Sequence, residues 1–322
     1  MEQNPEQVEA ESGVSRNQHR DGHHVTTTDS TDTTVAQVKQ KRFPVIELFG
    51  PVIQGEGAQA GLQTMFIRFG GCDYRCEKCD SLHAVIPEAV QKHATYMTAE
   101  EIYLKVAAAN HTTGVKWVTF SGGNPCMHKL DELVTRLNEG GYHINVETQG
   151  TLWQDWLNGV SLITIAPKMH GMGEKFEEDK FTYFLQQAGA RPICIKVVAF
   201  ANIDLEMALR VEDLVNQAYA DYARITDSRD YDQLPWVAYY LSLGNPFPPV
   251  LNPHTFELED NPILADESET AILADKVPLT LPERLLKSYK NLSEEVLADK
   301  RLKNWRFLPQ LHVLVYGNET ER

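Results

Sequence analysis

The sequence predicts an α/β fold, and three observations support this prediction. Several apolar runs are continuous rather than alternating, which is typical of strands buried on both faces of a parallel sheet. Helical patterns separate many of these runs, so strands and helices alternate along the chain. Clusters of glycine and cysteine follow directly after predicted strands. Because ligands of α/β folds gather at the carboxyl ends of strands, we expect the chemistry in these loops.

The chain has 322 residues, of which 42% are hydrophobic, and this is enough for a substantial core. Residues 1–42 differ from the rest, because they are rich in Glu, Gln, Thr, Asp and His and nearly lack large apolar side chains. Such a segment cannot bury enough surface to fold, so we expect a disordered N-terminal tail. From Phe43 onward strand and helix patterns begin, and one folded domain is expected at 43–322.

Strands are expected where short runs are rich in aliphatic and aromatic residues, and helices where apolar residues recur at helical spacing. The helix at 98–110 has a clear start, since Thr98 is a good N-cap and two glutamates lie in the first turn. The expected elements are the strands 43–48, 64–69, 115–120, 143–147, 162–166, 193–199, 236–243 and 311–316, and the helices 98–110, 127–139, 203–221 and 281–298.

One stretch, at about 246–280, interrupts this alternation. It contains five prolines between 246 and 262, followed by the acidic run 266–269. A proline-rich, acidic insertion of this length is uncommon in a compact domain and is usually a lid, a partner surface or disorder. The sequence leaves these three alternatives open.

Composition and charge exclude several classes of function. The chain has 30 Lys and Arg against 45 Asp and Glu, a net charge of -15, which repels a phosphate backbone, so no nucleic acid is expected as a partner. The longest apolar runs are strand-sized and far short of a membrane span, and the N-terminus lacks an apolar leader. Five cysteines, three of them clustered, do not form a disulfide framework. We expect a cytoplasmic protein without a membrane partner.

The clustered cysteines are Cys72, Cys76 and Cys79, in the run GGCDYRCEKCDS. Thiolates are the usual ligands of iron-sulfur clusters, and three of them leave one iron of a four-iron cluster free to bind a substrate. A zinc site is the alternative, because these cysteines and His83 would also form a tetrahedron. The spacing favours the cluster, but both interpretations remain open on the cysteines alone.

Two glycine-rich segments follow predicted strands. FGPVIQGEG, at 49–57, could bring backbone close to a ligand, although a plain turn explains it equally well. SGGNP, at 121–125, exposes backbone groups at a strand end, and a helix starting near Met127 would add its positive end. Arg68, in a buried strand, needs an anion, and its planar fork suits a carboxylate.

Together these motifs resemble the radical S-adenosylmethionine (SAM) enzymes, and within them the 7-carboxy-7-deazaguanine synthase family. The resemblance runs from about Phe43 to Gly317, except for the proline-rich insertion. It rests on the segments FGPVIQGEG, MFIRFGGCDYRCEKCDS, VTFSGGNP, NVETQGT with the nearby QDW, TIAPK, YLSLGN and RFLPQLH.

The resemblance implies a partial, open (β/α) barrel of the radical SAM type. It also implies the conversion of 6-carboxy-5,6,7,8-tetrahydropterin into 7-carboxy-7-deazaguanine and ammonia, on the route to queuosine and other deazapurines. The implied cofactors are a 4Fe-4S cluster, SAM and Mg²⁺. Flavodoxin or ferredoxin would donate electrons, and relatives are homodimers. The alternatives are another radical SAM enzyme, such as an activase, or a zinc-binding interaction protein. The tail or insertion could add a regulatory partner surface.

The resemblance assigns roles to individual residues. The three cysteines would hold the cluster, and Ser81 would offer its hydroxyl to Mg²⁺. His312 would reach the substrate pocket, or would instead be a satisfied histidine on a buried strand. Substrate contacts would be Ile53, Gln54, Gly55, Arg68, Ser121 and His312, and SAM contacts would be Lys78, Cys79, Asp80, Gly123, Ala166, Pro167, Lys168, Ser242, Leu243, Gly244 and Asn245.

Three residues depart from the pattern of the family. Lys78 stands where an aromatic residue is common, Asn124 replaces a glutamate, and Ala166 replaces a serine. We expect these changes to soften the contacts with SAM without removing its site. We assign no substrate role to the C-terminal residues.

Overall fold

The computed structural model describes residues 40–225, 236–263 and 279–319. Nearly all of the predicted N-terminal tail and residues 264–278 of the predicted insertion therefore lie outside the described residues. The folded part begins with a strand at Arg42, one residue earlier than expected.

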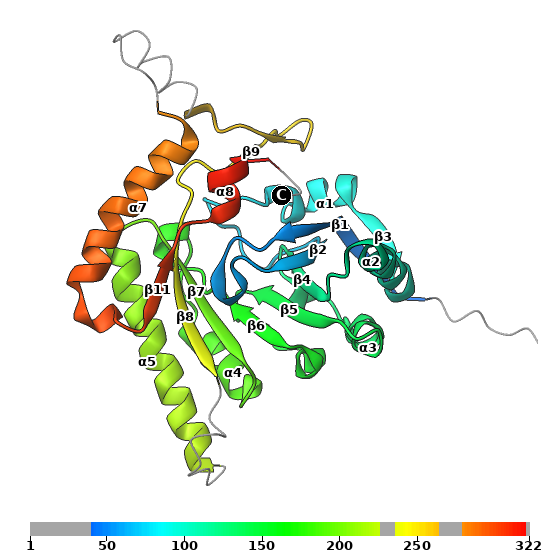
Figure 1. Cartoon of the computed structure of the whole chain (residues 1–322), viewed down its shortest axis with the longest axis horizontal. Helices are drawn as coiled ribbons and strands as arrows, with labels where there is room; N and C mark the ends of the chain where they lie inside the picture. The colour runs from blue at the N-terminus through cyan, green and yellow to red at the C-terminus, as the bar shows by residue number, and fades with distance from the viewer. Residues whose placement is uncertain (1–39, 226–235, 264–278, 320–322) are drawn as a thin grey trace, which may run out of the picture. The chain divides into compact units, whose positions relative to one another are not determined.

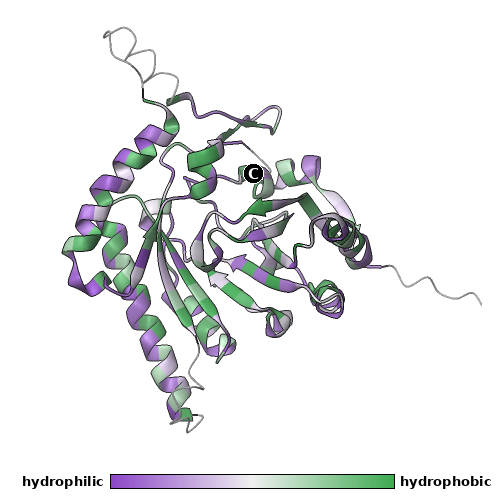
Figure 2. Cartoon of the chain, in the orientation of Figure 1, coloured by the Kyte–Doolittle hydropathy of each residue, from purple (hydrophilic) through white to green (hydrophobic). Residues whose placement is uncertain are grey.

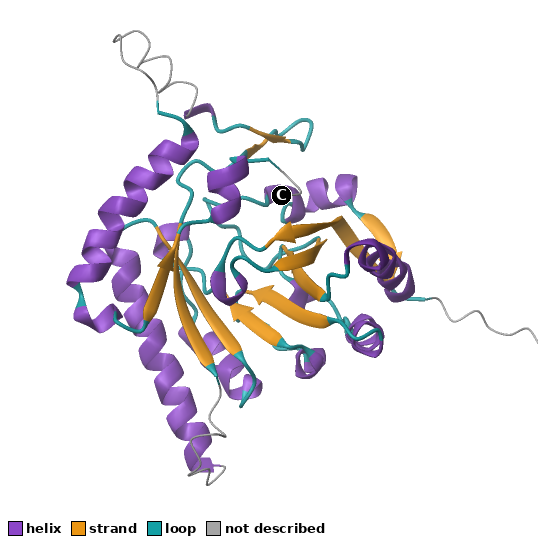
Figure 3. Cartoon of the chain, in the orientation of Figure 1, coloured by secondary structure: helices purple, strands orange, loops and turns teal. Residues whose placement is uncertain are grey.

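A nine-stranded sheet forms the centre of the fold, in the order β11-β8-β7-β6-β5-β4-β2-β1-β3 (Figures 1 and 3). Neighbouring strands from β2 to β11 are parallel, whereas β1 is antiparallel to both β2 and β3. The sheet does not close, because β11 and β3 are its two edges. This is the expected α/β architecture of a partial, open barrel. The strands are β1 (Arg42–Ile53), β2 (Gln63–Phe69), β3 (Thr95–Thr98), β4 (Trp117–Gly122), β5 (His143–Thr148), β6 (Leu162–Ile165), β7 (Ile193–Ala199), β8 (Val237–Leu243) and β11 (Trp305–Leu308).

Helices follow the sheet around its outer side in Figure 1, and their contacts agree with this arrangement, since α2 packs on α3 and α4 packs on α5. The predicted cap of α2 is confirmed: Thr98 accepts a hydrogen bond from the Glu101 N–H, and the Glu101 side chain accepts one from Thr98. Within the described residues, no helix is long and apolar enough to cross a membrane. The helices are α1 (Pro87–His93), α2 (Ala99–Thr113), α3 (Asp131–Glu139), α4 (Glu178–Ala188), α5 (Asn202–Ile225), α7 (Leu281–Ala298) and α8 (Leu311–Tyr316).

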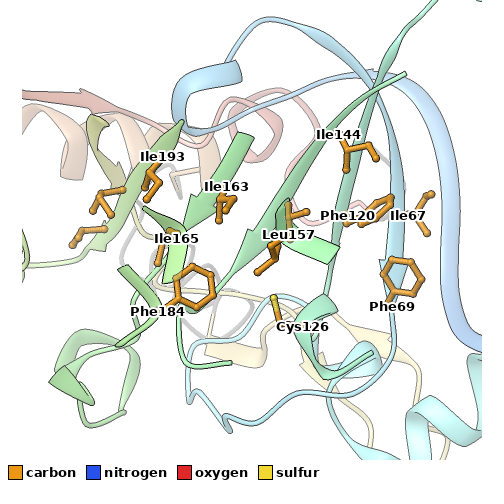
Figure 4. Packing of buried hydrophobic residues seen from close by; sticks show 14 of the residues in the cluster. Ile67, Phe69, Phe120, Cys126, Ile144, Leu157, Ile163, Ile165, Phe184 and Ile193 are labelled. Carbon is orange, nitrogen blue, oxygen red and sulfur yellow. The ribbon is translucent and has the colours of Figure 1, made fainter. Parts of the chain in front are cut away.

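The main core lies between the sheet and the helices, where apolar side chains of several strands meet those of α4 and neighbouring turns (Figure 4). Hydrophobic residues recur along the central strands (Figure 2). Phe69 and Phe120 meet edge to face with ring centroids 5.6 Å apart, a geometry worth about 1 kcal/mol beyond burial alone. Successive residues of a strand face opposite sides. In β7, for example, Ile195 and Val197 belong to the core, whereas Lys196 lines a pocket on the other side.

The structure corrects two predictions and adds elements that were not expected. Residues 311–316 form helix α8 rather than a strand, and the last strand is β11, which ends one residue before Pro309. A short apolar run does not distinguish strand from helix, and Val313 alone of this run is buried. The helix expected at 127–139 begins only at Asp131, because residues 125–127 form a separate turn. Strand β3 and helices α1 and α4 were not foreseen.

The described part of the predicted insertion contains a small hairpin, β9 (Val250–Leu251) with β10 (Leu258–Glu259). Helix α1 holds this hairpin. His93 Nε2 lies 2.7 Å from the carbonyl oxygen of Phe256, and Lys92 bonds to Glu257. The described part of the insertion therefore packs on the domain. Of the three alternatives that the sequence left open, disorder does not apply to these residues.

Candidate active site

One pocket lies at the carboxyl ends of the strands and receives side chains from most of the motifs singled out in the sequence. Four of the expected site residues, Pro167, Ser242, Leu243 and Gly244, do not line it. The expected residues that do line it are Ile53, Gln54, Gly55, Arg68, Cys72, Cys76, Lys78, Cys79, Asp80, Ser81, Ser121, Gly123, Ala166, Lys168, Asn245 and His312.

The cysteine loop forms one wall of the pocket and is itself largely buried, with Tyr74, Val85 and Met172 packed around it. Burial raises the pKa of Cys76 to about 11 and that of Cys79 to about 12. The free side chains are therefore thiols at neutral pH. Binding a metal centre requires them to lose protons, which couples loading to pH.

The zinc alternative required His83 to join the three cysteines. His83 instead lies beside Glu47, with its Nε2 atom 3.2 Å from Glu47 Oε1. No three His, Cys, Asp or Glu side chains in the described part of the chain gather as ligands of a single ion. The described side chains thus do not form the zinc tetrahedron. In a four-iron cluster each cysteine binds a different iron, so its ligands need not converge on one point.

The glycines of SGGNP bring two loops into direct contact. A Cβ atom on Gly122 would lie 2.1 Å from the carbonyl oxygen of Phe69, and one on Gly123 would lie 2.0 Å from that of Gly71. Gly122 also has a φ of +123°, which side chains rarely adopt. Only glycine fits at these positions. This cradle beside the cysteine loop suits a ligand that must approach the backbone, as SAM would.

Asn124, which departs from the pattern of the family, is fully buried and has no free polar atom. Its Nδ2 donates to Asp73 Oδ1 over 2.8 Å, and its Oδ1 accepts from Thr148 Oγ1 over 2.9 Å and from the Cys126 N–H over 3.1 Å. The side chain therefore ties the cysteine loop to β5. The expected helix dipole is not adjacent to SGGNP, since α3 begins only at Asp131.

The charged side chain of Arg68 needs an anionic partner because it is largely removed from water. Glu47 of the same chain is that partner. Its Nε donates to Glu47 Oε2 over 2.5 Å, and its Nη1 donates to Ser81 Oγ over 2.8 Å. Burial by itself raises the pKa of Glu47, but His83 and Arg68 outweigh this effect and lower the pKa to about 2. The Glu47 carboxylate therefore stays ionised at neutral pH. Nothing in the sequence pattern pointed to Glu47.

Ser81 follows the third cysteine and lies close to a second oxygen donor. Its hydroxyl donates to Asp80 Oδ1 over 2.9 Å and accepts from Arg68. A hydroxyl beside a carboxylate offers the hard oxygen ligands that Mg²⁺ prefers. The Ser81 oxygen accepts one hydrogen bond, from Arg68, and its second lone pair is available to a metal ion.

Two half-buried carboxylates and one buried lysine line the inner wall of the pocket, and the sequence analysis missed all three. Lys196 Nζ lies 2.9 Å from Glu56 Oε2 and 3.9 Å from Glu147 Oε1. Burial favours neutral Glu56, but Lys196, His312 and the hydrogen bond from Ser242 lower its pKa to about 2. A single lysine inside the apolar run ICIKVVA was the available signal, because a buried charge needs a partner.

This charged group orients residues that the resemblance assigned to ligands. Glu147 accepts hydrogen bonds from Gln54 Nε2 over 3.0 Å and from Ser121 Oγ over 2.9 Å. Glu56 accepts from Ser242 Oγ over 2.6 Å and from Gln310 Nε2 over 3.1 Å. Ser242 does not line the pocket itself. Its hydrogen bond helps to fix the position of Glu56, which does line the pocket.

His312 does reach the pocket, but from helix α8 rather than from a strand. It packs closely on Gly55, where a Cβ atom would lie 2.5 Å from the His312 Nδ1 atom. Gly244, also behind the wall, leaves room for the ring of Phe200, which would be 2.3 Å from a Cβ atom there. Lys78 places its ammonium 3.9 Å from the centroid of that ring.

The described part of the insertion and the end of the chain complete the pocket. Pro248, Pro249 and Leu258 line it, as do residues 317–319. Asn318 Oδ1 accepts from Asn245 Nδ2 over 2.9 Å. The C-terminal residues, to which we assigned no substrate role, therefore belong to the wall of the site.

Comparison with known proteins agrees with these motifs. Residues 66–163 match the family described as the Radical SAM superfamily. The 7-carboxy-7-deazaguanine synthase of Bacillus cereus is 32% identical over 86% of this chain and 98% of the relative. That of Bacillus subtilis is 34% identical over 87% of this chain and 98% of the relative.

Among solved structures, QueE from Escherichia coli is similar with a TM-score of 0.48 and 19% identity, over 84% of this chain and 95% of that chain. The two Bacillus relatives are similar along nearly their whole lengths. The chain belongs to the 7-carboxy-7-deazaguanine synthase family, and it is a radical SAM enzyme with a 4Fe-4S cluster and SAM as its cofactors.

Proposed function

We propose that this enzyme converts 6-carboxy-5,6,7,8-tetrahydropterin into 7-carboxy-7-deazaguanine and ammonia. The observation that carries the proposal is the pocket itself, which joins the three cysteines, the SGGNP cradle and Arg68. The names of the two Bacillus relatives support the same product.

In this proposal Cys72, Cys76 and Cys79 hold the cluster, and the glycine cradle with Lys168 holds SAM. When bound, the two cofactors supply the radical that removes hydrogen from the substrate, and the protein contributes orientation and exclusion of water. Of the other residues assigned to SAM, four line the pocket and would contact it directly: Lys78, Asp80, Ala166 and Asn245. The remaining four do not line the pocket and would act on SAM through their neighbours: Pro167, Ser242, Leu243 and Gly244.

Arg68 binds the carboxylate of the substrate in this proposal. Among the described residues its Nη2 makes no hydrogen bond, while Nε and Nη1 fix the plane of the guanidinium. Gln54 and Ser121 are held by Glu147 and face the same pocket. Ile53, Gly55 and His312 complete the contacts.

A magnesium ion is proposed beside Ser81, with Asp80 as the neighbouring carboxylate. Ser81 and Asp80 would hold the ion, and Arg68, whose Nη1 atom lies 2.8 Å from Ser81 Oγ, would bind the substrate carboxylate beside it. Lewis acids of this kind stabilise charge that develops on a bound carboxylate.

We also propose the wider setting that the family resemblance implies. Residues 43–322 form one catalytic domain with an insertion at about 246–280, and residues 1–42 are a tail outside it. The enzyme is a cytoplasmic homodimer, reduced by flavodoxin or ferredoxin, and it has neither a nucleic acid nor a membrane as partner. The high negative charge supports the absence of a nucleic-acid partner.

An anaerobic assay tests the proposed activity. The reconstituted enzyme is incubated with reductant, SAM and the carboxypterin, and the product is identified by its mass. We expect 7-carboxy-7-deazaguanine and one ammonia per pterin consumed. Cleavage of SAM with the pterin left unchanged would contradict the proposal and would favour a different radical SAM enzyme, such as an activase.

A further inference from the structure

Glu47 lies in strand β1 and lines the pocket, yet no motif assigned it a role. Its side chain is 12% exposed, and both of its carboxylate oxygens have a partner within the protein. Oε2 accepts a hydrogen bond from Arg68 Nε over 2.5 Å, and Oε1 lies 3.2 Å from His83 Nε2. Glu47 thus connects a buried histidine to the arginine that we assign to the substrate carboxylate.

The sheet itself brings Glu47 and Arg68 together. The two residues are direct partners in the antiparallel pairing of β1 and β2, where opposite side chains lie close to each other. The pairing shifts its register between Val45 and Glu47. Such irregularities re-aim a side chain and are common next to active sites. The position of Glu47 is therefore set by the backbone of the strand pair.

Glu47 and Ser81 together fix the guanidinium group of Arg68. This group is planar and its donors point in fixed directions, so two hydrogen bonds determine its plane. Nε donates to Glu47, and Nη1 donates to Ser81 Oγ over 2.8 Å. Glu47 is the charged partner of the two, and hydrogen bonds to charged groups are the stronger ones. Nη2, which bonds to no residue that the structure describes, is left for a ligand.

His83 contacts the other oxygen of Glu47 and so fixes the carboxylate in turn. It belongs to the short turn η2 (Leu82–Ala84), which follows Ser81 directly. The segment that carries the proposed magnesium ligand therefore also anchors the partner of Arg68. One segment thus holds Arg68 in two ways, directly through Ser81 and indirectly through His83 and Glu47.

Stability alone does not account for this ion pair. The cost of removing two charges from water can offset their mutual attraction, so such a pair is weak evidence for stability. Because Glu47 balances the charge of Arg68, the pair offers the substrate a donor of fixed direction rather than a net positive charge. The arrangement is suited to orienting a ligand.

We propose that Glu47 is a positioning residue for the reaction. It holds the Arg68 guanidinium in the plane in which the free Nη2 group meets the substrate carboxylate. Glu47 acts through Arg68 and does not itself bind the substrate. This inference rests on the proposed function, because it takes Arg68 as the partner of that carboxylate.

The first test compares Glu47→Leu and Glu47→Gln in the full-length, cluster-loaded enzyme, given SAM, reductant and the carboxypterin. We expect Glu47→Leu to lower kcat about ten- to a hundredfold and to change KM only a few-fold, because a misplaced substrate still binds but reacts poorly. More SAM should be cleaved per product formed. Glu47→Gln keeps an oxygen for Arg68 Nε and should recover most of the loss.

A double-mutant cycle with Arg68→Met tests whether Glu47 acts through Arg68. The double variant Glu47→Leu, Arg68→Met removes both charges of the pair, so neither is left buried without the other. Its kcat/KM should equal that of Arg68→Met alone, because no guanidinium remains to be positioned. A further fall by the full factor seen for Glu47→Leu would show an independent contribution and would overturn the inference.

Iron content and SAM affinity separate positioning from structural support. Both should stay at wild-type values in Glu47→Leu and in the double variant, and loss of iron from both would overturn the inference. Glu178→Leu is the matched control. Glu178 also accepts from an arginine Nε, that of Arg210 over 3.1 Å, but its side chain is 41% exposed and does not line the pocket, so this variant should match wild type.

The same measurements distinguish failure of the inference from failure of the proposed function. A wild type that forms the product, beside a Glu47→Leu variant with unchanged kcat, would overturn the inference alone. A loaded wild type that leaves the carboxypterin unchanged would overturn the proposed function, and the inference with it.

Discussion

The buried side chain of Lys196 keeps its charge because two carboxylates lie beside it. It is 6% exposed and lies between the carboxylates of Glu56 and Glu147. Burial of charges is unfavourable, but removal of one partner is worse, because the other charge stays buried and unpaired. The pair therefore specifies the geometry of the pocket more than it adds stability.

We predict that Lys196→Met lowers the free energy of unfolding by about 3–5 kcal/mol. The double variant Glu56→Gln with Lys196→Met should recover at least half of this loss, since it leaves no unpaired charge at position 56. Urea denaturation of the three proteins measures both effects. A single variant that is as stable as the double variant would contradict the charge pairing.

Two glutamates of the pocket wall, Glu47 beside Arg68 and Glu56 beside Lys196, predict a dependence of stability on pH. The ordinary pKa of a glutamate, 4.5, falls to about 2 for both Glu47 and Glu56 in the folded protein. Their stabilisation is therefore fully present above about pH 4.5 and is lost as the pH falls toward 2. We expect the unfolding midpoint to drop over this window, and to drop less steeply in the Glu56→Gln, Lys196→Met double variant. Equal slopes would argue against the lowered pKa of Glu56.

Arg68 carries the proposed recognition of the substrate carboxylate. Lysine keeps the charge but loses the planar fork, so Arg68→Lys should lower kcat/KM for the carboxypterin about ten- to a hundredfold. The iron content should not change. Arg306→Lys, on the exposed face of edge strand β11, is the control and should match wild type in both measurements. Loss of iron in Arg68→Lys would instead indicate that Arg68 supports the structure of the cysteine loop.

The sequence predicted those residues of the site that belong to recognisable motifs, such as the three cysteines and Arg68. It did not predict Glu47 or Glu56, because their significance depends on which side chains meet across the sheet. Spacing along the chain does not contain this information. Lys196 was missed although a lone lysine in an apolar run needs a buried partner.

At the scale of elements, the backbones of the loops after β2 and β4 are in direct contact. The glycines of SGGNP allow a backbone approach that any side chain would block. The cysteine loop therefore takes its shape partly from a segment about fifty residues away along the chain.

We predict that Gly122→Ala disrupts this contact and reduces the iron content of the reconstituted enzyme. Gly114→Ala is a matched control, since Gly114 also has a positive φ, of +74°, but a Cβ atom there would have no neighbour within 4 Å. The control should lose about 1 kcal/mol of stability from backbone strain and keep its iron. Equal iron in both variants would contradict the role of the close contact.

Helix α8 marks a limit of the prediction from sequence. The run LHVLVY is apolar enough for a buried strand, and its true form depends on the sheet ending at β11. Strands β2, β4, β5, β6, β7 and β8 were placed to within two residues, because their runs are rich in β-branched and aromatic side chains. The short β3 and α1 carried no comparable signal.

At the scale of the whole molecule, an open sheet leaves one side of the pocket to be completed by other segments. Helix α8, the β9–β10 hairpin of the insertion and residues 317–319 all contribute to the wall. The fold class followed from the alternation of strands and helices. The closure of the pocket did not, because it depends on contacts between segments far apart in the sequence.

The central claim is that the pocket around Cys72, Cys76 and Cys79 produces 7-carboxy-7-deazaguanine. The most direct test is a side-by-side turnover measurement of wild type and Cys76→Ala, each reconstituted anaerobically and given SAM, reductant and carboxypterin. We predict product of the expected mass from wild type, and neither cluster nor product from Cys76→Ala. Product formation by Cys76→Ala, or a wild type that holds its cluster but leaves the pterin unchanged, would contradict the account.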